Sequence, residues 1–500
     1  MVAAAAVIAM TLGGCSATSD AAGSDDAPSI LNLGITEEPT SFAPALSGPG
    51  TLPYYQSVYD SLLLREPDGE LSPMLATEWV YNDTQTELTL TLRDDVAFAD
   101  GSALDSSDVK ANLDAFAAAG GPESTQLKTL ASVDAPDATT VVLTLSEPEP
   151  ALLIYLSNSA GFIANEESLT GTALTTTPDG SGPYTLDATA TTVGSQYTFV
   201  RNADYWGTEL PYDTIVLKPL SDVSARLNAL KSGQINGALL SNVSSGQEAA
   251  AAGFTQVPSE VNFHGLLFFD REGTAVPALG DVRVRQAINY AIDRDLLVES
   301  VLFGEGTATS QIFGTGAAGY DEELDSYYDF DPEMARELLA DAGFAGGFEL
   351  TMPTVTIFDS TMLTLMAQML ADVGITVTYE DVPIADLFTA LRGGTYPSTY
   401  MQFAQPQDWV LINQFIAADA TWNPFNTADP AVQELIDTYK NGDAEAQAAA
   451  AEELNAIIVE EAWFAPFYRV VQQLFVDENT TAVPQVEVAQ PSIYNWAPKN

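Results

Sequence analysis

Apolar and polar residues alternate along several short segments of the chain, and the clearest of these begins at Leu88. Leucine occupies every second position of residues 88–92, and a period of two predicts a strand with one buried face. Asp100 and Gly101 predict a turn, because glycine adopts positive φ without a Cβ clash. Asp105 is then a suitable N-cap for a helix. The residues that follow it at helical spacing form an apolar stripe: Val109, Leu113 and Phe116.

The same two periodicities predict elements elsewhere in the chain. Strands are predicted at residues 30–35, 139–145 and 463–468, and helices at residues 54–64, 224–233, 281–293, 331–342 and 444–459. Asp281 and Asp331 are suitable N-caps, and Pro332 suits a first helical position. Strands and helices alternate between residues 259 and 475, which predicts one α/β lobe there. Arg283 and Arg285 suit either a carboxylate clamp or ion pairs to neighbouring elements, and we favour ion pairs.

Length and charge narrow the class of protein. A chain of 500 residues is too long for one core and indicates two or three lobes. Apolar residues make up 46% of the chain, which suffices for complete folding. The formal charge of −52 would repel nucleic-acid phosphates, so no nucleic-acid partner is expected. We interpret the acidic residues mainly as a solvated surface, with attraction of cationic ligands as the alternative.

Cysteine and histidine are each present once, as Cys15 and His264. A disulfide within the chain is therefore impossible, and so is a metal centre built from Cys and His clusters. We expect neither a metal nor a cofactor. His264 lies in an apolar segment, residues 261–269, where it is either a hydrogen-bonded strand residue, which we favour, or part of a cleft wall.

The first thirty residues have the pattern of an export signal. Residues 2–11 form an apolar run that is too short to span a bilayer, although no Lys or Arg precedes it. The run ends in Leu-Gly-Gly-Cys, which resembles a bacterial lipobox. We expect residues 1–14 to be a signal peptide, Cys15 to carry lipid, and residues 15–29 to be a flexible tether. The alternative is an ordinary secretory signal with an incidental cysteine.

Several ordered strings resemble signatures of one protein family. They are Leu-Arg-Asp-Asp-Val-Ala-Phe-Ala-Asp-Gly at residues 92–101, Gly-Ser-Gly-Pro-Tyr at 180–184, Asn-Ala-Asp-Tyr-Trp-Gly at 202–207, and the helical segments at 224–233, 281–293 and 331–344. The family is that of the large extracytoplasmic solute-binding proteins of ABC importers, family 5, the peptide/nickel-binding type. The resemblance extends over residues 30–496.

This resemblance implies an α/β fold of the periplasmic-binding-protein type, type II and cluster C, with three lobes. Lobe I would consist of residues 28–58, 182–258 and 476–500, lobe II of residues 59–181, and lobe III of residues 259–475. Two chain crossings between lobes I and III would form a hinge, and a ligand would close the cleft between them.

The resemblance also implies where a ligand binds. Relatives that take peptides hold the free α-amino group with an aspartate in the loop after a strand, and Asp408 is the matching residue here. Asp408 is equally suited to cap the helix that begins at Trp409. Five aromatic residues near this loop are candidates either for ligand contact or for core packing: Tyr396, Tyr400, Phe403, Trp409 and Trp422. Glu38, in an N-terminal loop, is a weaker candidate.

One feature of the dipeptide-binding relatives is missing. They clamp the ligand carboxylate with an arginine, but residues 348–378 contain no Arg or Lys, and Arg392 is the nearest. This favours longer peptides, or uncharged ligands such as oligosaccharides, over dipeptides. Nickel is disfavoured, because His264 is alone and a nickel site prefers imidazole donors.

The function that these observations favour is capture of an oligopeptide and its delivery to an ABC permease with separate ATPase subunits, since the sequence contains no Walker A motif. We expect a monomer that contacts the membrane through its lipid anchor only. A receptor that senses without transport is one alternative. An enzyme such as a carboxylate hydrolase is disfavoured, because GxSxG and HExxH motifs are absent.

Overall fold

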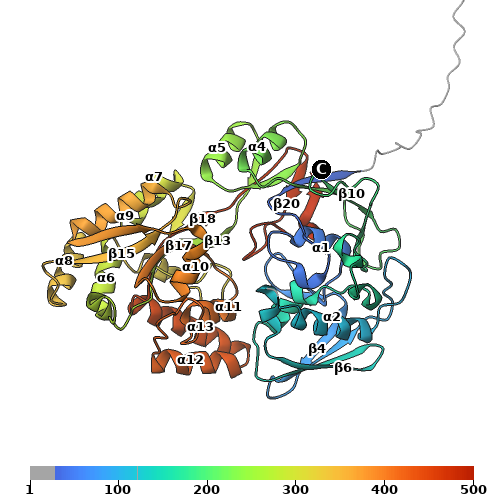
Figure 1. The fold of residues 1–500 in the computed structure, drawn as a ribbon, viewed down its shortest axis with the longest axis horizontal. Helices are drawn as coiled ribbons and strands as arrows, with labels where there is room; N and C mark the ends of the chain where they lie inside the picture. The colour runs from blue at the N-terminus through green and yellow to red at the C-terminus, as the bar shows by residue number, and fades with distance from the viewer. Residues whose placement is uncertain (1–28, 121, 500) are drawn as a thin grey trace, which may run out of the picture.

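The computed structural model describes residues 29–120 and 122–499. The predicted signal peptide, Cys15 and all but the last residue of the predicted tether lie outside these residues. Three main sheets, each with helices or loops packed on it, form the body of the molecule (Figure 1).

The first sheet has seven strands and gathers segments from both ends of the chain. Its order is β12-β19-β11-β1-β10-β9-β8. The strands are β1 (Ile30–Ile35), β8 (Tyr184–Leu186), β9 (Tyr197–Arg201), β10 (Thr214–Pro219), β11 (Gly237–Leu240), β12 (Thr255–Val257) and β19 (Gln473–Val476). α1 (Leu52–Val58), α4 (Val223–Lys231) and α5 (Val243–Ala251) accompany it. β19 pairs with β11 and β12, so residues 473–475 belong to this sheet, although the predicted boundary assigns them to lobe III.

The second sheet contains the strand, turn and helix that were predicted at residues 88–116. Its order is β4-β5-β7-β6, with β4 (Ala76–Tyr81), β5 (Glu87–Leu92), β6 (Leu130–Asp137) and β7 (Thr140–Leu145). The leucines of β5 are buried, and α2 (Ser106–Ala118) begins with Asp105 in a reciprocal capping box with Asp108. These predictions are confirmed. β2 (Leu63–Arg65), β3 (Leu71–Pro73) and α3 (Leu152–Leu156) complete this region.

The helix predicted at residues 54–64 is wrong in its second half. α1 ends at Val58, and the chain then runs extended into β2. Backbone groups of residues 58–62 bond to distant segments: the Asp60 and Val58 carbonyls accept from Ile163 and Gly182. The apolar residues at 59–64 are thus buried between two sheets in extended chain. Apolar periodicity alone cannot distinguish such a buried extended segment from a helix.

The third region is built around a sheet of order β14-β18-β13-β17. Its strands are β13 (Glu260–Phe268), β14 (Gly306–Ala308), β17 (Ser398–Ala404) and β18 (Phe464–Val471), and a separate parallel pair is β15 (Phe348–Thr354) with β16 (Ile375–Asp381). The helices are α6 (Val282–Ala291), α7 (Arg294–Leu302), α8 (Pro332–Asp341), α9 (Ser360–Asp372), α10 (Ile384–Arg392), α11 (Asp408–Leu411), α12 (Pro430–Asn441) and α13 (Ala444–Glu460). A π-helical turn, Ile412–Ile416, follows α11.

The predicted caps of this region are confirmed, with Asp281 as N-cap of α6 and Asp331 as N-cap of α8. Arg283 pairs with the Asp281 carboxylate, whereas the buried Arg285 guanidinium donates to backbone carbonyls, among them that of Leu279 at 2.8 Å. Both arginines therefore hold α6 in place, as we favoured, although Arg285 does so mainly through backbone carbonyls.

Two crossings join the first sheet to the third region within the described residues. One runs from β12 to β13 through residues 258–259, and the other from β18 to β19 through Gln472. The Gln472 backbone N–H donates to the Ser259 carbonyl at 2.7 Å, so the crossings lie side by side. Figure 1 shows β13 and β18 leading out of the region that holds α6 to α13. The C-terminal segment, described as far as residue 499, returns with β20 (Thr480–Ala482) and β21 (Trp496–Pro498).

Candidate functional site

The candidate ligand carboxylate, Asp408, is the first residue of α11. The N-cap of this helix is Gln407, whose side chain accepts from the Trp409 N–H at 2.9 Å, so the alternative that Asp408 caps the helix is wrong. The Asp408 oxygens instead accept the backbone N–H groups of Ala318 at 3.1 Å and Gly319 at 3.4 Å. The loop before α11 thus presents a carboxylate that is 3% exposed and fixed by backbone donors.

Asp408 lines a cavity of about 240 Å³, which we call the Asp408 cavity. Its lining residues come from the loop after β14, from α11 and its N-cap, from α12 and α13, and from the C-terminal segment: Gly316, Ala317, Ala318, Gln407, Asp408, Tyr439, Ala444, Gln447, Ala448 and Glu487. None of these residues, all within the described part of the chain, is Lys or Arg. The cavity therefore combines apolar walls with two carboxylates.

Burial raises the pKa of Asp408 to about 6, and the neighbouring Glu487 charge acts in the same direction. The N–H groups of Gly319 and Ala318 oppose this shift but do not cancel it. Burial likewise raises the pKa of Glu487, although Arg65 lowers it. Burial beside the cavity thus disfavours the ionised form of both carboxylates. A bound cation would stabilise that ionised form.

Sequence reasoning missed Glu487 and its partner Arg65. Their side chains form an ion pair between residues that are 422 positions apart, and both are about nine-tenths buried. No local pattern marks Glu487 among the 69 acidic residues of the chain. Only the return of the C-terminal segment beside β2 pairs Glu487 with Arg65 and brings Glu487 to the Asp408 cavity.

The aromatic candidates divide between two faces of the third sheet. Phe403, Trp409, Tyr396 and Trp422 belong to one hydrophobic cluster, in which the Phe403 and Trp422 rings lie 4.9 Å apart between centroids. Trp409 stacks on Tyr439 at 5.5 Å, and Tyr439 lines the Asp408 cavity. Trp409 therefore supports a wall of the cavity from behind, whereas the other three rings pack within the core.

Tyr400 lies on the opposite face of that sheet and belongs to a second hydrophobic cluster. His264 lies beside it on the same face. His264 Nδ1 is 3.0 Å from the Tyr400 hydroxyl, and its ring stacks on Tyr468. Burial lowers the pKa of His264 to about 4, so the imidazole is neutral at physiological pH. Among the described residues, no three His, Cys, Asp or Glu side chains group in a way that could hold a metal ion.

The two remaining candidates lie apart from the Asp408 cavity. Glu38 is exposed beside the first sheet, where its carboxylate accepts from the Tyr197 hydroxyl at 3.3 Å. Arg392, the nearest substitute for the missing arginine, stacks over Trp422 at 5.5 Å. Neither residue lines the Asp408 cavity.

The second sheet region also contacts the third. Lys440 of α12 pairs with Glu147 at 2.7 Å, and the Gln85 amide donates to the Gly442 carbonyl at 2.8 Å. Ala151 belongs to the hydrophobic cluster of Phe403 and Trp409. The family resemblance implies a cleft between lobes I and III only, whereas here residues of the predicted lobe II meet the predicted lobe III as well.

Comparison with known proteins gives the family to which this fold belongs. The model of the "Bacterial extracellular solute-binding proteins, family 5 Middle" matches residues 70–427, which is more than half of the chain. The chain belongs to this family. It is thus an extracytoplasmic protein that binds a small solute and works with an ABC permease.

Individual relatives agree with this assignment. The chain is 28% identical over 405 residues to "Glutathione-binding protein GsiB" of Salmonella paratyphi A, covering 75% of each chain. HbpA2 from Haemophilus parasuis has a TM-score of 0.83 at 20% identity, over 94% of this chain and 100% of that one. DppA from Helicobacter pylori, in complex with the peptide STSA, has a TM-score of 0.72 at 20% identity, over 94% and 98%. The chain therefore has the three-lobe, type II periplasmic-binding-protein fold. Among the described residues, no helix is both long and apolar enough to cross a membrane.

Proposed function

We propose that the solute is an oligopeptide with a free N-terminal ammonium group, and that Asp408 binds this group. The observation that carries the proposal is the buried Asp408 carboxylate beside a cavity whose lining contains a second carboxylate and no Lys or Arg. An ammonium group forms charge-assisted hydrogen bonds with such a carboxylate and restores neutrality at a desolvated site.

The names of the relatives support a peptide over an oligosaccharide. Glutathione is a tripeptide, and the DppA complex contains the peptide STSA. An oligosaccharide has no charge to offer Asp408, and the aromatic candidates pack in the core or behind Tyr439. The proposal includes no catalytic step, because a binding protein has to release its solute unchanged to the permease.

A thermal-shift and calorimetry screen tests the ligand class. It includes trialanine, glutathione, longer peptides, N-acetylated peptides and oligosaccharides. We expect a free-amine peptide to bind and Asp408→Ala to weaken that binding at least about 100-fold, since the ammonium loses a buried charge partner. Glu38→Ala, which removes an exposed carboxylate away from the cavity, is the matched control. Preference for oligosaccharides, or unchanged affinity of Asp408→Ala, would contradict the proposal.

The lipid anchor is a second part of the proposal, and the Leu-Gly-Gly-Cys string at residues 12–15 supports it. One acyl-modified cysteine followed by a polar tether would hold a monomer at the outer face of the membrane. We expect Cys15→Ser to move the protein from the membrane fraction to the soluble fraction. Ser16→Ala serves as control, and membrane retention of Cys15→Ser would refute the anchor.

A further inference from the structure

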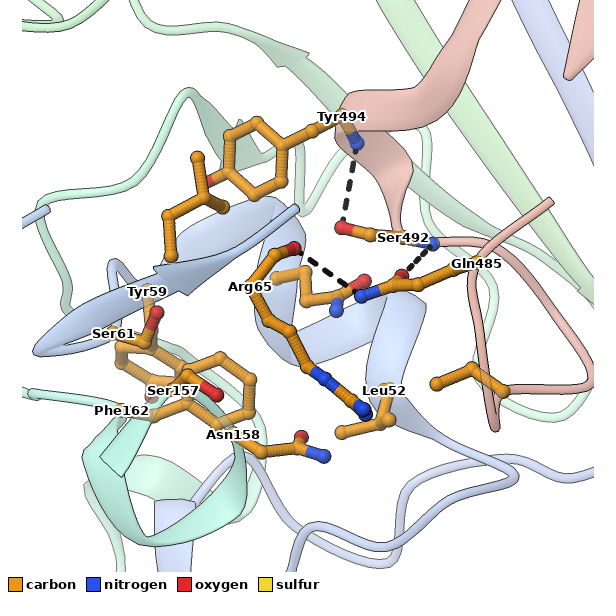
Figure 2. A pocket seen from close by; sticks show the side chains of 13 residues that line it. Leu52, Tyr59, Ser61, Arg65, Ser157, Asn158, Phe162, Gln485, Ser492 and Tyr494 are labelled. Atoms are coloured by element: carbon orange, nitrogen blue, oxygen red, sulfur yellow. Dashed lines mark hydrogen bonds between the residues drawn. The ribbon is translucent and has the colours of Figure 1, made fainter. Parts of the chain in front are cut away.

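The segment that presents Glu487 is fixed to the second sheet region. The Val486 N–H donates to the Pro67 carbonyl at 2.9 Å, and the Gln485 amide donates to the Arg65 carbonyl at 3.2 Å. Figure 2 shows the bond between the Gln485 amide and the Arg65 carbonyl, with the Arg65 side chain ending near Leu52 and Asn158. The ion pair of Arg65 with Glu487 completes the attachment. Glu487 is therefore expected to move together with lobes I and II.

The Val486 side chain fits against two glycines on different lobes. A Cβ at Gly69, whose φ is +93°, would lie 2.8 Å from Val486 Cγ2, and a Cβ at Gly316 would lie 3.3 Å from Val486 Cβ. Gly69 is part of the β2–β3 connection, and Gly316 lines the Asp408 cavity. Because the two glycines have no Cβ, residues 485–487 can lie between the two parts of the molecule. In this position Glu487 reaches the cavity.

Asp408 and Glu487 line the same cavity, but they come from different parts of the chain. The Asp408 carboxylate is bonded to Ala318 and Gly319 of lobe III, and lobe III connects to the first sheet through residues 258–259 and Gln472 in the described chain. A rotation about these crossings would change the separation of the two carboxylates. Their ionised forms repel each other, and the single positive charge of Arg65 leaves one negative charge uncompensated.

From these contacts we infer that Glu487 and Asp408 bind the ligand ammonium together from opposite lobes, and that their repulsion holds the cleft open until a cation arrives. The inference rests on the proposed peptide function and adds Glu487 as a determinant of specificity. A bound ammonium group replaces the repulsion between the two carboxylates with an attraction to each of them. Closure of the cleft thus becomes coupled to binding of the ammonium group. A ligand without a positive charge leaves the repulsion in place and closes the cleft poorly.

The cavity lining suits an organic ammonium better than a metal ion. A Ca²⁺ ion takes about six to eight oxygen ligands. Apart from the two carboxylates, the side chains that line the cavity are those of four alanines, at 317, 318, 444 and 448, of Tyr439 and of two glutamines. Apolar walls of this kind cover the carbon atoms next to an ammonium group, whereas a metal ion would lack ligands there.

Calorimetry with trialanine and N-acetyl-trialanine tests the binding part. We expect Glu487→Gln, which keeps the shape of the side chain, to weaken trialanine binding about tenfold or more and not to weaken the binding of N-acetyl-trialanine, for which it only removes the repulsion. Glu478→Gln makes the same substitution at an exposed position of the same segment and should match the wild type. If Asp408→Asn weakens trialanine binding while Glu487→Gln does not, the role of Glu487 is refuted and the peptide proposal stands.

Small-angle scattering of the ligand-free proteins tests the repulsion. We expect Glu487→Gln and Asp408→Asn each to have a smaller radius of gyration than the wild type, because each removes one of the opposed charges. Melting curves confirm that the variants are folded. Equal radii for wild type and both variants would overturn the coupling. If the wild type binds neither peptide, the peptide proposal fails, and the scattering result alone then decides whether the two carboxylates repel.

Discussion

At Asp408, the carboxylate that we propose as the ammonium ligand, burial makes the charge sensitive to pH. Its pKa lies at about 6, above the ordinary 3.8, because desolvation disfavours the ionised form. Binding of an ammonium requires that ionised form. We therefore expect the affinity for free-amine peptides to fall as the pH drops below about 6, by up to about tenfold per pH unit. Calorimetry between pH 4.5 and 8 measures this, and a flat profile would contradict it.

The stability of the ligand-free protein should change in the opposite direction. Because folding raises the Asp408 pKa, its contribution to stability is complete below pH 3.8 and is lost as the pH rises through about 6. The loss corresponds to about 3 kcal/mol for this residue. Glu487 shifts in the same direction, so the comparison of wild type with Asp408→Asn isolates the Asp408 share. Denaturant unfolding at pH 4 and pH 7 measures the difference.

Among the helices and strands, the sequence predicted best where the cause is local. The leucines of β5, the capping box of Asp105 and the Asp331 cap of α8 depend on neighbours within a few residues, and the structure has all three. The helix predicted at residues 54–64 is wrong only after Val58, in the part where Asp60 is held by distant side chains. Ser181 and Trp206 each donate to its carboxylate at 2.8 Å, far from it in sequence.

The candidate site shows the same division. The family resemblance led to Asp408, and the structure places this carboxylate beside a cavity. Glu487 and Arg65 could not be found in this way, because their pairing depends on how residues 476–500 return to β2. The aromatic candidates Phe403 and Trp422 lie close to the site in sequence, but the alternation of side chains and the turn after β17 direct them into the core. Of the two alternatives that the sequence left open for these rings, the structure has core packing for Phe403 and Trp422.

At the scale of the whole molecule, contacts between the second and third regions supplement the two chain crossings between the first sheet and the third region. Figure 1 shows α12 and α13 on the side of the third region that faces α2 and β4. The Lys440 and Glu147 side chains pair there at 2.7 Å, and both are partly exposed. An exposed ion pair contributes about 1 kcal/mol or less, so this contact can be broken at little cost in free energy.

This ion pair offers a test of closure that leaves the Asp408 cavity untouched. We expect Lys440→Glu to weaken peptide binding about threefold to tenfold, because it places like charges at the contact and so favours the open form. The double variant Lys440→Glu/Glu147→Lys restores opposite charges and should recover most of the affinity. The effect should shrink at high salt, since exposed charges are screened. Calorimetry at low and high salt decides the matter, and a loss of affinity that the double variant does not recover would show that Lys440 acts otherwise than through closure.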